Sequence, residues 1–105
     1  MTTYKTLVTP EELEPLVDLQ ASVWQTSDRN STPHNMLMAI THAGGVIMAA
    51  ISEDGQYVGF NFAIVAKRNG EFILWSHMTG ILPEYQGKGI GKRLKFEQRL
   101  WALEH

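Results

Sequence analysis

The sequence predicts an α+β fold, in which helices cover a mainly antiparallel sheet and the elements follow in the order β-α-α-β-β-β-α. Three observations predict this fold. Helix-start signals precede two amphipathic stretches in the first half of the chain. In the second half, Asp-Gly and Asn-Gly turns separate three apolar runs, as in antiparallel hairpins. A glycine-rich segment then leads into a last helix. With 105 residues, the chain holds at most one domain.

The first predicted helix begins with a capping box. Thr9 precedes Glu12 by three residues and Pro10 stands at the first helical position, so the pattern predicts a helix from Pro10. Pro15 removes a backbone hydrogen bond beyond the first turn, so the helix either begins nearer Glu12 or bends. A short edge strand is expected before it, over Tyr4–Val8. The apolar stripe of the helix comprises Leu13, Leu16, Val17, Ala21 and Trp24, and the polar Gln20 interrupts it.

A second helix and a meander of three strands are expected next. The helix starts at Thr32-Pro33 and ends before Gly44-Gly45, because paired glycines favour a helix terminus. The strands are expected over residues 46–51, 57–67 and 72–82, joined by tight turns.

The last helix is expected from Gly89 to the end of the chain. Its apolar residues form one broad side, and its basic residues form the other. The apolar set is Ile90, Leu94, Phe96, Leu100, Trp101 and Leu103, and the basic set is Lys92, Lys95 and Arg99.

The segment before this helix carries the pattern of an anion-binding site. Gly87, Gly89 and Gly91 let the backbone turn tightly and approach a ligand closely. The first amides of a helix have no intrahelical acceptors, so with the helix dipole they attract an anion such as a pyrophosphate. Lys88 and Lys92 add positive charge. Residues 88–105 carry a net charge of +3, against −5 for residues 1–87. The sequence therefore predicts a binding device for a small anionic ligand here.

Other phosphate-binding loops fit this segment poorly. A Walker loop needs Ser or Thr after Gly-Lys, but Arg93 follows Gly91-Lys92. The dinucleotide fingerprint needs glycines spaced G-x-G-x-x-G within a parallel βαβ unit, whereas these glycines are spaced G-x-G-x-G after hairpin-linked strands. A glycine-rich turn with solvated lysines is the remaining alternative, and the strand, Pro83, Tyr85 and the basic helix around it make that alternative unfavourable.

The segment resembles motif A of the GNAT superfamily of N-acetyltransferases, Q/R-x-x-G-x-G/A, at Gln86, Gly89 and Gly91. The preceding run Ile81–Tyr85 looks like the usual strand end of that family. Further segments are similar to a less-studied subgroup of predicted acetyltransferases, so the resemblance covers nearly the whole chain: Val23-Trp24, Gly44-Gly45, Ser76–Tyr85 and Gln98–Leu103.

This resemblance implies an acyl-CoA co-substrate, acetyl-CoA by default, and no metal. The pantetheine arm would pair with the last strand at Thr79, Gly80 and Ile81, and the Ile81 amide would hold the developing oxyanion. The acceptor would be a primary amine, either of a small molecule or of a protein amino group. The pyrophosphate would lie on the run Gln86, Gly87, Lys88, Gly89, Ile90, Gly91 and Lys92.

The general base cannot be assigned from the resemblance alone, and His77 has two interpretations. Many family members use a glutamate that aligns near Trp75, which cannot act as a base. His77 lies two residues further on, so the strand period puts it on the same face, and its ordinary pKa suits proton transfer. The alternative is that His77 is a packed or hydrogen-bonded strand histidine. Glu71 is a weaker candidate near the start of the strand.

The family fold normally continues with a fifth strand, a fourth helix and two more strands, which this sequence lacks. We therefore expect residues 1–105 to be a single partial domain whose last strand has an open edge. Either the chain is a fragment, or another copy completes the sheet as a homo-oligomer or strand-exchanged dimer. The isolated chain should be a poor enzyme.

Two functions remain from these expectations. The first is an acyl-CoA-dependent N-acyltransferase, and the second is a non-catalytic CoA-binding, acyl-CoA-binding or assembly module. Nucleic acid is disfavoured as a partner because the basic patch is short and the net charge is −2. The absence of cysteine excludes disulfides and thiolate metal sites. The sequence has no apolar run of membrane-spanning length, so no membrane partner is expected. We also expect a cytoplasmic location.

Overall fold

The computed structural model describes residues 2–24 and 34–104, without the side chains of residues 21–24, 77 and 78. It confirms the expected order of elements. The expected helix start at Thr32-Pro33 lies outside the described residues. The elements are β1 (Thr3–Thr6), α1 (Pro10–Trp24), α2 (His34–His42), β2 (Val46–Ile51), β3 (Tyr57–Arg68), β4 (Glu71–Ile81), the 3-10 helix η2 (Pro83–Tyr85) and α3 (Ile90–Glu104).

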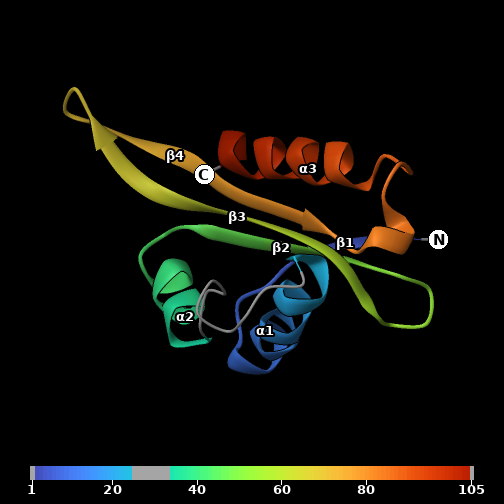
Figure 1. Ribbon diagram of the computed structural model, residues 1–105. Coiled ribbons are helices and arrows are strands. Elements are labelled where there is room, and N and C mark those ends of the chain that lie inside the picture. Colours follow the sequence, from blue (N-terminus) through green and yellow to red (C-terminus); the bar gives the residue numbers. More distant parts are fainter. Residues whose placement is uncertain (1, 25–33, 105) are drawn as a thin grey trace.

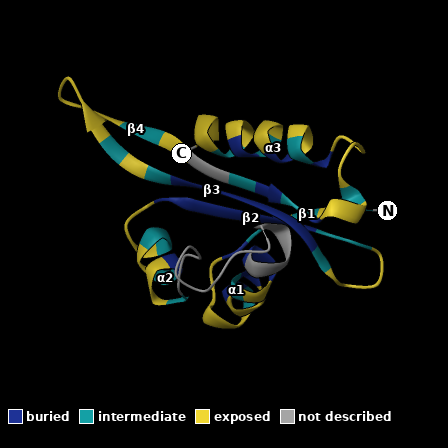
Figure 2. Cartoon of the chain, in the orientation of Figure 1, coloured by how far each residue is buried: buried dark blue, intermediate teal, exposed yellow. Residues whose placement is uncertain are grey.

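The sheet lies between two helical layers. Its strands follow in the order β1-β2-β3-β4, and every neighbouring pair is antiparallel. Helices α1 and α2 cover one face of the sheet and α3 covers the other (Figure 1). This arrangement explains why β2 is apolar on both sides, since both of its faces are buried. Burial is concentrated in β2 and in the first half of β3, while the outer sides of the helices are exposed (Figure 2).

The start of α1 confirms the capping box. The Glu12 amide donates to Thr9 Oγ1 at 3.2 Å, and the Thr9 amide donates to Glu12 Oε1 at 3.0 Å. The helix begins at Pro10 and continues through Pro15 to Trp24, so it does not start later. Gln20, which interrupts the apolar stripe in the sequence, is itself buried.

The β3–β4 hairpin closes on a two-residue turn. Arg68 pairs with Glu71, leaving Asn69 and Gly70 as the loop. Their φ angles are +52° and +82°, the left-handed conformation that a type I′ turn requires at both positions. The Asn-Gly dipeptide thus determines the register in which β4 begins to pair with β3.

The broad apolar side of α3 is buried only in part. Its buried residues are Ile90, Leu94 and Gln98, and Trp101 packs against the core from the same side. Phe96, Leu100 and Leu103 are exposed instead. One helix face of about 100° is enough to cover a sheet, so the wider apolar set of α3 extends beyond the surface that β2, β3 and β4 offer it.

Candidate cofactor-binding site

The loop between η2 and α3 has the backbone that the glycine pattern predicts. Gly87 and Gly89 have φ angles of +80° and +81°, which other residues adopt only with strain. No atom lies within 4 Å of where a Cβ would stand at either residue. Glycine is therefore required at both positions by the backbone conformation. A Cβ atom would meet no steric obstacle there.

The first turn of α3 presents free amides. The first hydrogen bond of the helix runs from the Arg93 amide to the Gly89 carbonyl oxygen at 3.0 Å. Within the part of the chain that the structure describes, no backbone acceptor faces the amides from Gly87 to Lys92. These donors and the positive end of the helix dipole form a site for an anion.

Gly91 differs from the other two glycines. It lies inside α3 without a positive φ. A Cβ there would stand 3.8 Å from Ile81 Cγ1, an ordinary contact. The first turn of α3 and the end of β4 are therefore direct neighbours, and an alanine fits at this position.

The charged side chains around the loop divide into two groups. Arg93 is engaged internally, because it pairs with Glu97 at 2.9 Å and lies over the Tyr4 ring at 5.2 Å. Lys88 lies over the Tyr85 ring at 5.3 Å, and Lys88 and Lys92 are both exposed. The two lysines are the cations that can meet an anion at the loop.

The end of β4 offers backbone groups to an open edge. The Leu82 amide donates to the Val58 carbonyl oxygen at 2.9 Å. Because bonded and non-bonded pairs alternate in an antiparallel ladder, the polar groups of Thr79 and Ile81 point away from β3. Gly80 pairs with Phe60, so its backbone groups point to β3 and not to the edge as expected from the sequence.

Gln86 has a local role in this arrangement. Its Nε2 donates to the Ile81 carbonyl oxygen at 3.1 Å, tying the loop to the strand end. The Ile81 carbonyl is thereby occupied, while the Ile81 amide still faces the edge. The predicted site residues are thus brought to one corner of the molecule, where β4 ends and α3 begins.

A β-bulge changes the basis of the His77 prediction. Phe62 pairs with Met78 and Ala63 pairs with Ser76, so His77 is the extra residue in β4. The period of two fails across a bulge. Trp75 pairs with Ile64 and Thr79 with Asn61, which lie on opposite faces of β3. The period-of-two argument that put His77 on the same face as residue 75 therefore does not apply across this bulge. The His77 side chain lies outside the described residues, and its role as the base stays a prediction.

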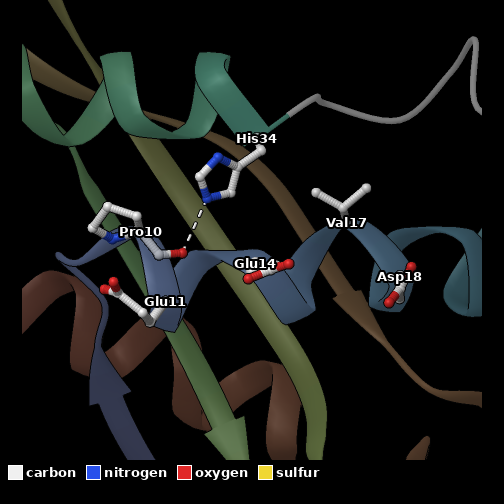
Figure 3. Close-up of a pocket in the computed structure, with 6 residues that line it drawn as sticks. All are labelled: Pro10, Glu11, Glu14, Val17, Asp18 and His34. Carbon is white, nitrogen blue, oxygen red and sulfur yellow. Dashed lines mark hydrogen bonds between the residues drawn. The ribbon is translucent and has the colours of Figure 1, made fainter.

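A pocket of about 470 Å³ lies elsewhere, on the helical layer of α1 and α2. Figure 3 shows His34 at the start of α2 donating from Nε2 to the Pro10 carbonyl oxygen at 3.0 Å. The exposed carboxylates Glu11, Glu14 and Asp18 line the same pocket. It lies across the sheet from α3, so it is not the cofactor site that the glycine loop predicts.

A second pocket lies beside the end of β4. It measures about 240 Å³ and is lined by Asp18 and Leu19 of α1, by Tyr57 and by Leu82, which follows β4 directly. The Tyr57 hydroxyl donates to the Glu12 carbonyl oxygen at 2.9 Å. Partial burial raises the pKa of Tyr57, so this phenol stays neutral near pH 7. Sequence periodicity alone had not brought these residues together.

The family comparison settles the classification. The model of the acetyltransferase (GNAT) family matches residues 10–103. The chain belongs to the GNAT acetyltransferase family. Its coarse activity is accordingly acyl transfer. No curated protein sequence matches the chain.

Solved structures confirm the GNAT fold. An acetyltransferase from Trypanosoma brucei superposes with a TM-score of 0.75 at 17% identity, over 99% of this chain and 76% of that one. An aminoglycoside acetyltransferase from an uncultured soil metagenomic sample, in complex with sisomicin, gives 0.81 at 16% identity, over 98% and 70%. A GNAT family acetyltransferase from Staphylococcus aureus gives 0.73 at 18% identity, over 98% and 78%.

The helices of this GNAT chain are short. Within residues 2–24 and 34–104, every helix falls short of the length and apolar character needed to cross a membrane. The cytoplasmic location expected from the sequence stays a prediction.

Proposed function

We propose that the chain binds acetyl-CoA at the corner between β4 and α3 and that its acetyltransferase activity acts on a primary amine. One observation carries the proposal. The acceptor-free amides of the glycine loop lie next to the outward-facing backbone of Thr79 and Ile81. The loop amides, with Lys88 and Lys92, would hold the pyrophosphate, and the strand edge would hold the pantetheine arm.

Transfer would then be a direct attack on the thioester. The amine nitrogen attacks the carbonyl carbon, and a C–N bond forms as the C–S bond breaks. The sulfur leaves as a thiolate and takes up a proton, while the nitrogen gives its proton to a base. The Ile81 amide, facing the open edge, would stabilise the oxyanion that develops on the carbonyl oxygen. His77, at the bulge of β4, is our candidate base.

A small-molecule amine is the acceptor we favour, and a protein amino group is the other candidate. Aminoglycoside acetyltransferases are among the structures similar to this chain. The carboxylates Glu14 and Asp18 on α1 also give this side of the molecule a negative potential that attracts ammonium groups. The pocket between Asp18 and Leu82 is close enough to the end of β4 to receive such an amine.

Isothermal titration with CoA and acetyl-CoA tests the cofactor site. Gly89→Glu adds a strained backbone and a negative charge to the loop, so it should abolish binding. Gly70→Glu is the matched control, because Gly70 has a φ of +82°, open space around it and a place in the β3–β4 turn, at the opposite end of β4 from the loop. We expect the parent and Gly70→Glu to bind alike. No binding by a folded parent, or equal binding by folded Gly89→Glu, would refute the site.

The alternative function is a non-catalytic module that binds CoA or an acyl-CoA. It is favoured by the lack of a carboxylate at Trp75 on β4, where many family members have their base. Mixing acetyl-CoA with a panel of amines and following free thiol distinguishes the two. Thiol release that depends on the amine supports the enzyme, whereas binding without release supports the module.

A further inference from the structure

One buried polar contact joins α3 to the sheet. Asn61 of β3 is fully buried, and its Nδ2 donates to the carbonyl oxygen of Leu94 in α3 at 3.0 Å. The other sheet-facing contacts of the first half of α3 are apolar and come from Ile90 and Leu94. Apolar contacts have no preferred direction, so the Asn61 bond is the directional contact in this part of the interface.

Stability does not explain why an asparagine stands at this position. Asn61 Oδ1 has no hydrogen-bond partner among the described residues, and neither has Nε2 of Gln98, a buried residue of α3. A buried acceptor left unpaired costs at least as much free energy as one hydrogen bond contributes. A leucine, whose side chain has the same branched outline of four heavy atoms, would bury apolar surface without that cost. The directional bond to α3 is the contribution of Asn61 that a leucine could not replace.

The location of the bond suggests what it does. Asn61 pairs with Thr79, whose backbone faces the open edge, and Leu94 lies one turn beyond the first residue of α3. On the same face of β3, Gly59 lets α3 approach closely. A Cβ there would stand 3.3 Å from Ile90 Cγ2 and 2.8 Å from Ile81 Cδ1. Gly59 thus determines how near α3 lies to the sheet, and the Asn61 bond determines how far along its own axis it lies.

We propose that Asn61 is a positioning residue for the cofactor, which holds the loop amides of α3 in register with the edge groups of Thr79 and Ile81. The proposal rests on the proposed function, because it assumes one ligand that spans both places. A pyrophosphate and a pantetheine arm belong to one molecule of fixed length, so a shift of α3 along its axis would weaken binding at both ends.

Asn61→Leu in the whole chain tests this role, with Gln98→Leu as the matched control. Both changes replace a buried amide in the same interface, but only the first removes the bond to α3. For Asn61→Leu we expect the urea midpoint to stay equal or rise while the dissociation constant for CoA rises roughly tenfold, the effect of a small misplacement. For Gln98→Leu we expect unchanged affinity. Equal affinity of both variants, or stability and affinity falling together in Asn61→Leu, would overturn the proposal.

A second measurement keeps the two hypotheses apart. The ¹⁵N–¹H amide shifts of residues 87–92 report the position of the loop without any ligand. They should move in Asn61→Leu and stay in place in Gln98→Leu. If the parent does not bind CoA, the proposed function fails, and unchanged loop shifts in Asn61→Leu would refute the positioning role independently.

Discussion

Gly89 and Gly91 lie two residues apart, yet they have opposite requirements. Gly89 has a φ of +81°, where an alanine is strained by about 1–2 kcal/mol. Gly91 is helical, and alanine is favoured over glycine in a helix by about 1 kcal/mol. We therefore expect Gly89→Ala to lower the free energy of unfolding and Gly91→Ala to raise it, as measured by urea denaturation. A change of the same sign in both variants would contradict the backbone described for the loop.

Glu12 makes the stability of the chain depend on acid. The Lys5 ammonium, with Nζ 2.6 Å from Glu12 Oε2, and then the amides of Val8 and Thr9 lower the pKa of Glu12 to about 2. A carboxyl whose pKa is lower in the folded state stabilises the fold above its ordinary pKa of 4.5, and this contribution disappears as the pH falls toward 2.

The Glu12→Gln variant measures this contribution. Its free energy of unfolding should lie below that of the parent at neutral pH, and the difference should shrink below pH 4.5. Denaturant titrations at several pH values between about 2 and 7 provide the comparison. A difference that is constant across this range would mean that the carboxylate charge has no part in holding Lys5 and the start of α1 together.

At the scale of elements, the sequence predicted what depends on local chemistry. The capping box at Thr9 and the Asn69-Gly70 turn act through neighbouring residues, and the structure confirms both. The bulge at His77 could not be predicted, because it depends on how β4 pairs with a strand that lies elsewhere in the sequence. The glycine loop could be predicted because it depends on neighbouring residues. The position of His77, the candidate base, could not, because it depends on the pairing of β4 with β3.

Which apolar residues of α3 are buried could not be predicted without the fold. Leu94 is fully buried, whereas 52% of Phe96 is exposed, although both were assigned to one apolar side. Leu94→Ala should therefore cost about 2–5 kcal/mol of unfolding free energy. Phe96→Ala should cost clearly less, because much of its ring already contacts solvent. Urea denaturation of both variants checks the assignment, and equal losses would return Phe96 to the buried face.

At the scale of the whole molecule, the candidate site lies between the α3 layer on one face of the sheet and the α1 layer on the other (Figure 1). Helix α1 carries the acidic residues Glu11, Glu14 and Asp18. The end of β4 is where the two sides meet, since Ile81 contacts the α3 side and Leu82 lines a pocket with α1. Under the proposed function, the cofactor from one side and the amine from the other would meet there.

The outer edge of β4 leads to the last prediction. In the part of the chain that the structure describes, no strand pairs with that edge, and Glu71 is the one carboxylate or ammonium that β4 carries between residues 71 and 81. Long edge strands with few charges pair readily with another chain. We therefore propose that the chain self-associates through β4, and we expect its mean mass in light scattering to rise with concentration.

Ser76→Pro tests whether β4 is the contact. Counting from the hairpin closed by Arg68 and Glu71, bonded and non-bonded positions alternate, so the Ser76 amide points away from β3. Proline there leaves the ladder with β3 intact and removes a donor from the open edge. We expect Ser76→Pro to be monomeric and Ser76→Ala to associate like the parent. Association that persists in a folded Ser76→Pro chain would place the contact on another surface, of which the exposed Phe96, Leu100 and Leu103 of α3 would be the first to substitute.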